Sequence, residues 1–194
     1  MIDLVAALTF FQNAAKRGDM HAQSRLGDAL RLGELGLEID LGAALTWFEK
    51  AAGGGDIYAQ WRLGCAHEDG DLGLKIDLEV ARTWFQKAAE GSDRPSQFEL
   101  GVAYDKGELG LVTDEDEALK WHRMAADGDL AGAQGRLGET YEHSELGLAI
   151  DLEAARTWYQ EAAEGCSRFL QFRLGVPNDK GELGLVTDEE EALK

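Results

Sequence analysis

The dipeptide Leu-Gly recurs with a period of 37 residues through this chain of 194 residues. It stands at Leu26-Gly27, Leu63-Gly64, Leu100-Gly101, Leu137-Gly138 and Leu174-Gly175. Aspartate keeps the same period at Asp3, Asp40, Asp77, Asp114, Asp151 and Asp188. A constant period of roughly 20–50 residues indicates stacked supersecondary units, because no single unit can bury its apolar face alone. The sequence therefore predicts a repeat array whose core grows by the addition of units.

One unit, residues 40–76, has the pattern of two helices joined by glycines. Asp40 is a suitable N-cap, and the apolar residues that follow it share one helical face. They are Ala44, Trp47, Phe48 and Ala51. Gly53-Gly54-Gly55 ends this first helix, since glycine accepts the left-handed conformation. A second helix is expected from about Asp56 to His67. The fold class is therefore all-α, with a first and a second helix in each repeat.

The period divides the chain into five repeats and the start of a sixth, with no Pro- or Ser-rich linker between them. The expected bounds are 3–39, 40–76, 77–113, 114–150 and 151–187, followed by a truncated unit at 188–194. Pro177 replaces a helical residue of the other copies and should end the last second helix early. Because neither end has an obvious polar cap, we expect the chain to be a segment of a longer array.

Most residue types that recur at fixed positions have a structural interpretation. The tryptophans at Trp47, Trp84, Trp121 and Trp158 lie at helical spacing beside alanines and are predicted to be core. The Leu-Gly glycines imply close approach of a neighbouring helix, since glycine costs about 1 kcal/mol inside a helix. Asp114 with Glu117 has the spacing of a capping box. A ladder of glutamines is expected to bond buried backbone groups: Gln23, Gln60, Gln97, Gln134 and Gln171.

The formal net charge is −18, from 37 acidic and 19 basic residues. Such a surface repels phosphate backbones and anionic lipid, which argues against nucleic acid and membranes as partners. A basic protein or peptide fits this charge better. Alternatively, the carboxylates serve only to keep an exposed surface soluble, which explains the composition equally well.

The apolar stretch 5–11 follows no basic residue and is in phase with 42–48, so it is predicted to be a repeat helix and not a signal peptide. No stretch approaches the ~20 apolar residues of a membrane span. Cys65 and Cys166 occupy different repeat positions, which argues against a disulfide framework and fits a reducing compartment. We therefore expect a cytoplasmic protein.

No constellation for catalysis, metal binding or cofactor binding is apparent. His21, His67, His122 and His143 form no metal-binding spacing, and His122 stands where another repeat has Phe48. The acidic runs 114–117 and 188–191 could hold a cation, but they also begin helices, where negative charge is favourable. The sequence therefore predicts no catalytic, metal or cofactor residue and a protein that is not an enzyme.

The repeat resembles the Sel-1-like repeat, a relative of the tetratricopeptide repeat. The resemblance rests on Asp77, Ala81, Trp84-Phe85, Lys87-Ala88-Ala89, Gly91, Leu100-Gly101, Tyr104, Gly107, Gly110-Leu111 and Asp114, and on their counterparts in each copy. It implies a right-handed α/α superhelix and a role as a scaffold or adaptor for protein partners. A cysteine-rich branch of the family binds β-lactams, but the cysteine pairs that define that branch are missing here.

Partner contacts are expected on the first helices, opposite the tryptophans, at polar positions that vary between repeats. The candidates are Thr46, Glu49, Lys50, Thr83, Gln86, Lys87, Lys120, Arg123, Met124, Thr157 and Gln160. The resemblance implies that this face is concave. The predicted function is a non-catalytic protein-binding scaffold. Three alternatives stay open: a β-lactam-binding hydrolase, a regularised array without a natural partner, and a plain solvated helix face.

Overall fold

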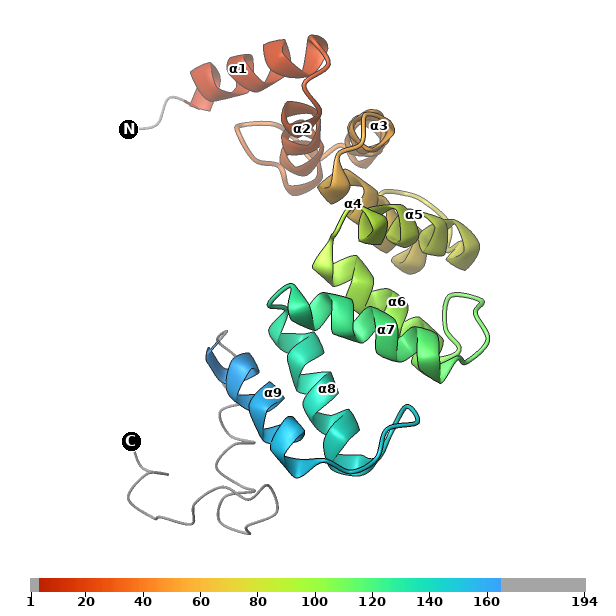
Figure 1. Cartoon of the computed structure of the whole chain (residues 1–194). Coiled ribbons are helices and arrows are strands. Elements are labelled where there is room, and N and C mark those ends of the chain that lie inside the picture. The colour runs from red at the N-terminus through yellow and green to blue at the C-terminus, as the bar shows by residue number, and fades with distance from the viewer. Residues whose placement is uncertain (1–3, 165–194) are drawn as a thin grey trace. The chain divides into compact units, whose positions relative to one another are not determined.

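The computed structural model describes residues 4–164, and every regular element in this part of the chain is an α-helix (Figure 1). The described helices are α1 (Leu4–Lys16), α2 (Met20–Leu32), α3 (Leu41–Gly53), α4 (Ile57–Asp69), α5 (Leu78–Glu90), α6 (Arg94–Lys106), α7 (Glu115–Asp127), α8 (Ala131–His143) and α9 (Leu152–Glu164). Odd-numbered helices are the first helices of the repeats and even-numbered helices are the second. The predicted all-α helical-repeat fold is confirmed.

The chain forms two compact units, Met1–Ser96 and Gln97–Lys194. The first unit holds α1 to α5, and its helices pack in sequence order, α1 with α2, α2 with α3, α3 with α4 and α4 with α5. In the second unit α7 packs on α8 and α8 on α9. Each helix therefore contacts mainly its neighbours in sequence, as expected for an array without a single central core.

Aspartates begin the first helices, as their period predicts. Asp40 has an extended backbone and accepts a hydrogen bond from the Ala43 amide at 2.9 Å. Asp114 caps α7 in the same way, with the Glu117 amide at 3.0 Å. The predicted capping box is wrong, however. The Asp114 amide donates to the Tyr104 carbonyl, and the Glu117 carboxylate pairs with Lys120.

Within residues 4–164, the glycine of each Leu-Gly pair receives an aromatic ring from the following first helix. A Cβ added to Gly64 would lie only 2.6 Å from the Phe85 ring, and one added to Gly138 would lie 2.6 Å from the Tyr159 ring. A real Cβ would clash at that distance, so only glycine permits this fit. The predicted close packing is confirmed, and it joins each second helix to the next first helix within each unit.

The most deeply buried aromatic residue is not tryptophan but the residue after it. Phe48, Phe85 and Tyr159 are each 0% exposed, whereas Trp47 and Trp84 are only half-buried. Consecutive helical residues differ in direction by about 100°, so only one of the two can face the glycine. The prediction that the tryptophans are core is confirmed for Trp121, which is 9% exposed. Trp47, Trp84 and Trp158 are partly buried and pack against the buried clusters. Phe10, in the tryptophan position of the first repeat, is 69% exposed.

The loop between repeats is held by a leucine in the left-handed region. Leu72 and Leu109 have φ of 55° and 52°, and both are buried at the base of their turns. This backbone conformation costs a residue with a Cβ roughly 1–2 kcal/mol. Burial of a leucine side chain stabilises by about 1.5–3 kcal/mol, which offsets that strain. The second leucine of each loop, Leu74 and Leu111, is only half-buried.

The glutamine ladder joins the two helices of a repeat. Gln23, Gln60 and Gln134 each donate from Nε2 to a backbone carbonyl eight residues earlier, at 3.1, 3.3 and 3.3 Å. These carbonyls belong to Ala15, Ala52 and Ala126, in the last turns of the first helices. Each of these carbonyls also accepts an amide from the turn after its helix, those of Gly18, Gly55 and Asp129. The glutamine adds a second hydrogen bond to the carbonyl and thereby joins the second helix to the end of the first.

Some predictions concern residues that the structure does not describe. They are the early helix end at Pro177, the truncated unit 188–194, the acidic run 188–191, the glutamine Gln171 and the thiol of Cys166.

Candidate partner-binding face

The residues predicted to contact a partner all lie on first helices, and the structure leaves each of these side chains exposed. They are Thr46, Glu49 and Lys50 on α3, Thr83, Gln86 and Lys87 on α5, Lys120, Arg123 and Met124 on α7, and Thr157 and Gln160 on α9. We call this surface the first-helix face, and describe it separately for each unit. All of these side chains are therefore accessible to a partner, but they differ in the contacts that they make within the protein.

The threonines of the face use their hydroxyl protons within their own helices. Thr46 donates to the Gly42 carbonyl at 3.0 Å. Thr83 and Thr157 make the same bond four residues back, at 2.9 Å. Such bonds are typical of threonine inside a helix. The threonines consequently present mainly a methyl group and an acceptor oxygen to a partner.

Two lysines of the first unit lie over tryptophan rings. The Lys50 ammonium is 4.6 Å from the Trp47 ring centroid, and the Lys87 ammonium is 4.2 Å from that of Trp84. A cation over an aromatic face is attracted by about 0.5–1 kcal/mol at an exposed site. This attraction holds each flexible lysine in one place, and the tryptophan stays partly open beside it. The prediction that these positions lie opposite the tryptophans is therefore wrong for Lys50 and Lys87, because residues three apart share one side of a helix.

A groove lies between α1 and α3 in the first unit, with a volume of about 320 Å³. We call it the α1–α3 groove, and its lining residues are Gln12, Lys16, Leu26, Leu30, Leu37, Ala43 and Trp47. Leucines of α2 and of the loop provide apolar surface, while Gln12 and Lys16 are exposed polar residues of α1. Pockets with mostly apolar walls and few polar groups are typical of binding sites.

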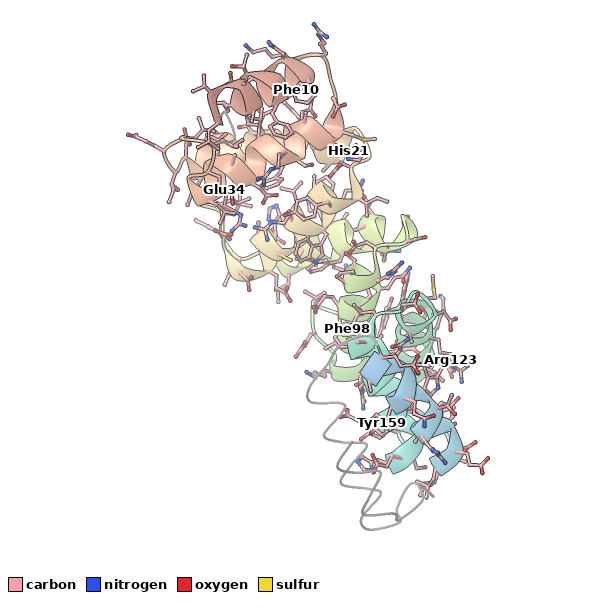
Figure 2. All side chains as sticks on the ribbon, turned by 90° about the vertical axis from the view of Figure 1, so that its left-hand side faces the viewer. Phe10, His21, Glu34, Phe98, Arg123 and Tyr159 are labelled. Carbon is pink, nitrogen blue, oxygen red and sulfur yellow. The ribbon has the colours of Figure 1, made fainter. Side chains whose placement is uncertain are left out.

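The first-helix face of the second unit has different contacts. Arg123, labelled in Figure 2, lies on α7. It donates to the Tyr141 hydroxyl of α8 at 3.2 Å. Lys120 pairs with Glu117 at 2.9 Å. Met124, in the position of Lys50 and Lys87, is 41% exposed. The cationic groups of this unit are thus engaged with neighbouring side chains, in contrast to the lysines of the first unit.

A second polar cluster lies on the second helices of the first unit, around Asp56. This carboxylate is 3% exposed and caps α4 through the Ala59 amide. It also accepts the Ser24 hydroxyl at 2.7 Å and lies 2.9 Å from His21 Nδ1. Serine and histidine both contact the aspartate and not each other, so the three residues lack the relay of a catalytic triad. Sequence analysis missed this cluster, which joins residues 32–35 positions apart.

The same cluster contains a partly buried hydrogen bond from Tyr58 to Asp28. The Tyr58 hydroxyl donates to Asp28 Oδ2 at 2.8 Å. Burial, then the hydrogen bond and the negative charge of Asp28, raise the pKa of Tyr58 to about 12. Arg31 lies 3.6 Å from the other Asp28 oxygen. These contacts indicate that the cluster joins α2 to α4 as a structural network.

His122 replaces the buried aromatic residue in the second unit. Its side chain is 0% exposed, and neither ring nitrogen has a hydrogen-bond partner within the described part of the chain. Its ring lies 5.4 Å from that of Phe98 on α6. Burial, helped by the positive charge of Arg136, lowers the pKa of His122 to about 4. The structural role predicted for this histidine is confirmed.

Arg136 on α8 connects two acidic residues of the second unit. It pairs with Asp105 at 2.7 Å and also with Glu145. Burial disfavours its charged form, but hydrogen bonds to Glu145 and Asp105 outweigh that effect and raise the pKa of Arg136. The ion pair between Arg136 and Asp105 joins α8 to α6.

Metal coordination finds no support in the described residues. Within 4–164, no group of three or more His, Cys, Asp or Glu side chains is arranged to hold a metal ion. The acidic run 114–117 is used in helix capping and in the pair with Lys120. Of the other histidines, His21 and His143 are exposed and His67 is half-buried.

The Sel1 repeat family matches residues 3–19, 21–56, 57–93, 94–130 and 131–165. The chain belongs to the Sel1 repeat family. In the family's phase a full repeat starts at a second helix and continues into the next first helix, which places the glycine and the aromatic ring that packs on it within one repeat. Sel1 repeats generally serve as scaffolds for protein–protein interaction.

Solved structures of Sel1 repeat proteins resemble this chain. A Sel1 repeat protein from Oxalobacter formigenes has 32% identity and a TM-score of 0.90, covering 98% of this chain and 76% of its own. A protective antigen of uropathogenic Escherichia coli has 31% identity and a TM-score of 0.85 over 95% of this chain and 38% of its own. This chain therefore spans under half of the antigen.

A more distant likeness supports the fold alone. An immunity protein from Pseudomonas aeruginosa has 20% identity and a TM-score of 0.65, with 96% of this chain and 68% of its own covered. A search of curated protein sequences found no relative. Among the helices of residues 4–164, none has the length and apolar character needed to cross a membrane.

Proposed function

We propose that this Sel1 repeat protein is a non-catalytic scaffold that binds a protein segment along its first-helix face. The α1–α3 groove supports the proposal, because one of its walls is α3, the helix that also carries Thr46, Glu49 and Lys50. None of the residues predicted from sequence to contact a partner lines the groove itself. Trp47 forms part of its lining and remains half-buried beside Lys50. Partly exposed tryptophans are frequent among residues that dominate binding energy.

The contrast between constant and variable positions of the repeat supports the same function. Glycine, glutamine and aspartate recur because they pack, bridge or cap, as the contacts of Gly64, Gln60 and Asp40 illustrate. Exposed first-helix positions instead differ between copies, for instance Lys50 against Met124. A repeat array can vary such positions at little cost to its core, since each repeat needs only its neighbours.

Site-specific photocrosslinking tests the proposal. A photoreactive phenylalanine analogue would replace Glu49, on the first-helix face, or Lys75, in the exposed loop before α5. With an extract of the source organism, we expect a discrete protein adduct from position 49 and none from position 75. Equal labelling from both positions, or no adduct from either, would contradict the assignment of the face.

The non-catalytic part of the proposal has its own test. Incubation of the intact protein with a fluorescent penicillin and with a chromogenic β-lactam should give neither a stable adduct nor turnover. Saturable turnover that follows the purified protein through chromatography would replace the scaffold by the hydrolase alternative.

A further inference from the structure

Three exposed lysines lie on the first helices of the first unit, one on each of α1, α3 and α5. Lys16, Lys50 and Lys87 are exposed, and none of the three forms an ion pair within residues 4–164. Glu49 is next to Lys50 in sequence, but neighbouring helical residues do not face each other. Three ammonium groups are therefore available on α1, α3 and α5.

The carboxylates of the same unit are largely committed elsewhere. Asp40 and Asp77 bind the first amides of their helices. Glu34 pairs with Arg25 at 2.9 Å, and Asp71 lies near Arg62 at the end of α4. These acidic groups sit at helix starts and in loops. The first helices of this unit also carry three exposed glutamates, Glu49, Glu79 and Glu90, against the three exposed lysines. The face is therefore close to neutral, in contrast to the net charge of −18 of the whole chain.

Local charge decides which partner this face attracts. Interactions between exposed charges are screened beyond about 8 Å at physiological salt, so nearby lysines outweigh distant carboxylates. Trp47 and Trp84 also hold Lys50 and Lys87 in place, which reduces the side-chain entropy lost on binding. The basic partner predicted from composition does not suit a face with these cations.

We propose that the α1–α3 groove and its flanking lysines bind an acidic protein segment with an apolar anchor. The anchor side chain occupies the groove against Leu26, Leu30 and Trp47. Carboxylates on either side of it meet Lys16 and Lys50, and Lys87 extends the contact along α5. A short acidic segment fits the lysines beside the groove, Lys16 and Lys50, whereas a long nucleic acid would also meet the repulsion of the whole chain. This inference rests on the proposed scaffold function and names the class of its partner.

Selection from a random peptide library on the intact protein tests the inference. The displayed peptides would be about 12 residues long, a length that spans neighbouring repeats in extended form. We expect selected peptides to combine Asp or Glu with one large apolar residue. Selection of Lys- and Arg-rich peptides that still compete at the first-helix face would overturn the acidic partner and leave the scaffold function standing. Selection of no peptide would overturn both.

Charge reversal separates the face from the overall charge. Binding of the selected peptide, labelled with fluorescein, should weaken about fivefold or more in Lys50→Glu, the change expected when an exposed ion pair becomes a repulsion. Lys75→Glu alters the net charge equally in an exposed loop of the same unit and should leave the affinity unchanged. Equal losses in both variants would overturn the inference. So would tighter binding of a single-stranded oligonucleotide than of the peptide.

Discussion

Replacing His122 by phenylalanine should make the second unit more stable and less sensitive to acid. The described contacts leave both nitrogens of this fully buried ring without a hydrogen-bond partner. A buried polar group without a partner costs about 1–3 kcal/mol, so His122→Phe should gain roughly that amount near neutral pH. Phe48 and Phe85 already occupy the same position of other repeats beside a glycine. The substitution therefore introduces a ring that this packing accepts.

The acid dependence follows from the lowered pKa of His122, about 4 in the folded protein. The unfolded chain binds a proton near the ordinary histidine pKa of about 6.5, so between these values it binds more protons than the folded chain. The contribution of neutral His122 to the free energy of unfolding is fully present above this pH range and is lost as the pH falls through it. From about pH 7.5 to about pH 5 the loss is roughly 2 kcal/mol. Arg136 and Asp105 face the ring with opposite charges, and Arg136 has the larger effect.

Hydrogen exchange of α6 and α7 amides is the suitable assay, because a repeat array need not unfold in two states. The wild type and His122→Phe should be compared at both pH values, since carboxylates common to both variants also titrate. We expect protection in the wild type to fall by about 2 kcal/mol more than in the variant. His143→Gln changes an exposed histidine and should behave as the wild type. Equal acid dependence of the wild type and His122→Phe would refute the reasoning.

Three further predictions concern packing and ionisation. Gly64→Ala should destabilise the first unit by about 1–3 kcal/mol in urea denaturation through overpacking, because its Cβ would lie 2.6 Å from the Phe85 ring; Gly42→Ala, whose Cβ meets only Asp40 at 3.6 Å, is the control. Phe85→Ala should cost about 3–5 kcal/mol and more than Trp84→Ala, and the reverse order would restore tryptophan to the centre of the core. In ultraviolet titration, Tyr58 should ionise near pH 12, and Tyr58→Phe should remove that step. Ionisation of Tyr58 near pH 10 would contradict its hydrogen bond to Asp28.

The local elements were predictable because their causes are local. The side chain of Asp40 caps the helix that follows it. Glycines end that helix because their backbone is free to leave the helical conformation. Gln60 bonds within its own repeat, so its short sequence separation made the bond foreseeable. The expected second helix, from about Asp56, agrees with the observed Ile57–Asp69 within two residues at either end.

Contacts between repeats were the source of the errors. The capping box at Asp114 fails because its amide donates to Tyr104 in the preceding second helix. The Asp56 cluster joins α2 to α4, and no pattern within one helix reveals which polar groups meet there. The left-handed leucines were likewise unforeseen, because burial against the repeat offsets a backbone strain that sequence rules assign to glycine.

The candidate face was foreseeable in its location and not in its chemistry. Helical spacing was enough to place Lys50 and Lys87 on an exposed surface. The Lys–Trp pairs and the groove depend on how α1 and α3 pack, which fixes how much of Trp47 remains open. The net charge favoured a basic partner because it averages over groups that are far apart and differently paired.

The all-α repeat, its period and its aspartate caps follow from spacing and from the conformational preferences of single residues, so they were predictable from the sequence alone. The tertiary structure decided which aromatic residue is buried, placing Phe85 and not Trp84 against Gly64. It also decided which charges are paired, such as Lys120 with Glu117, and which remain available, such as Lys50. A period identifies equivalent positions, but only packing against the neighbouring repeat determines which side of each helix is covered.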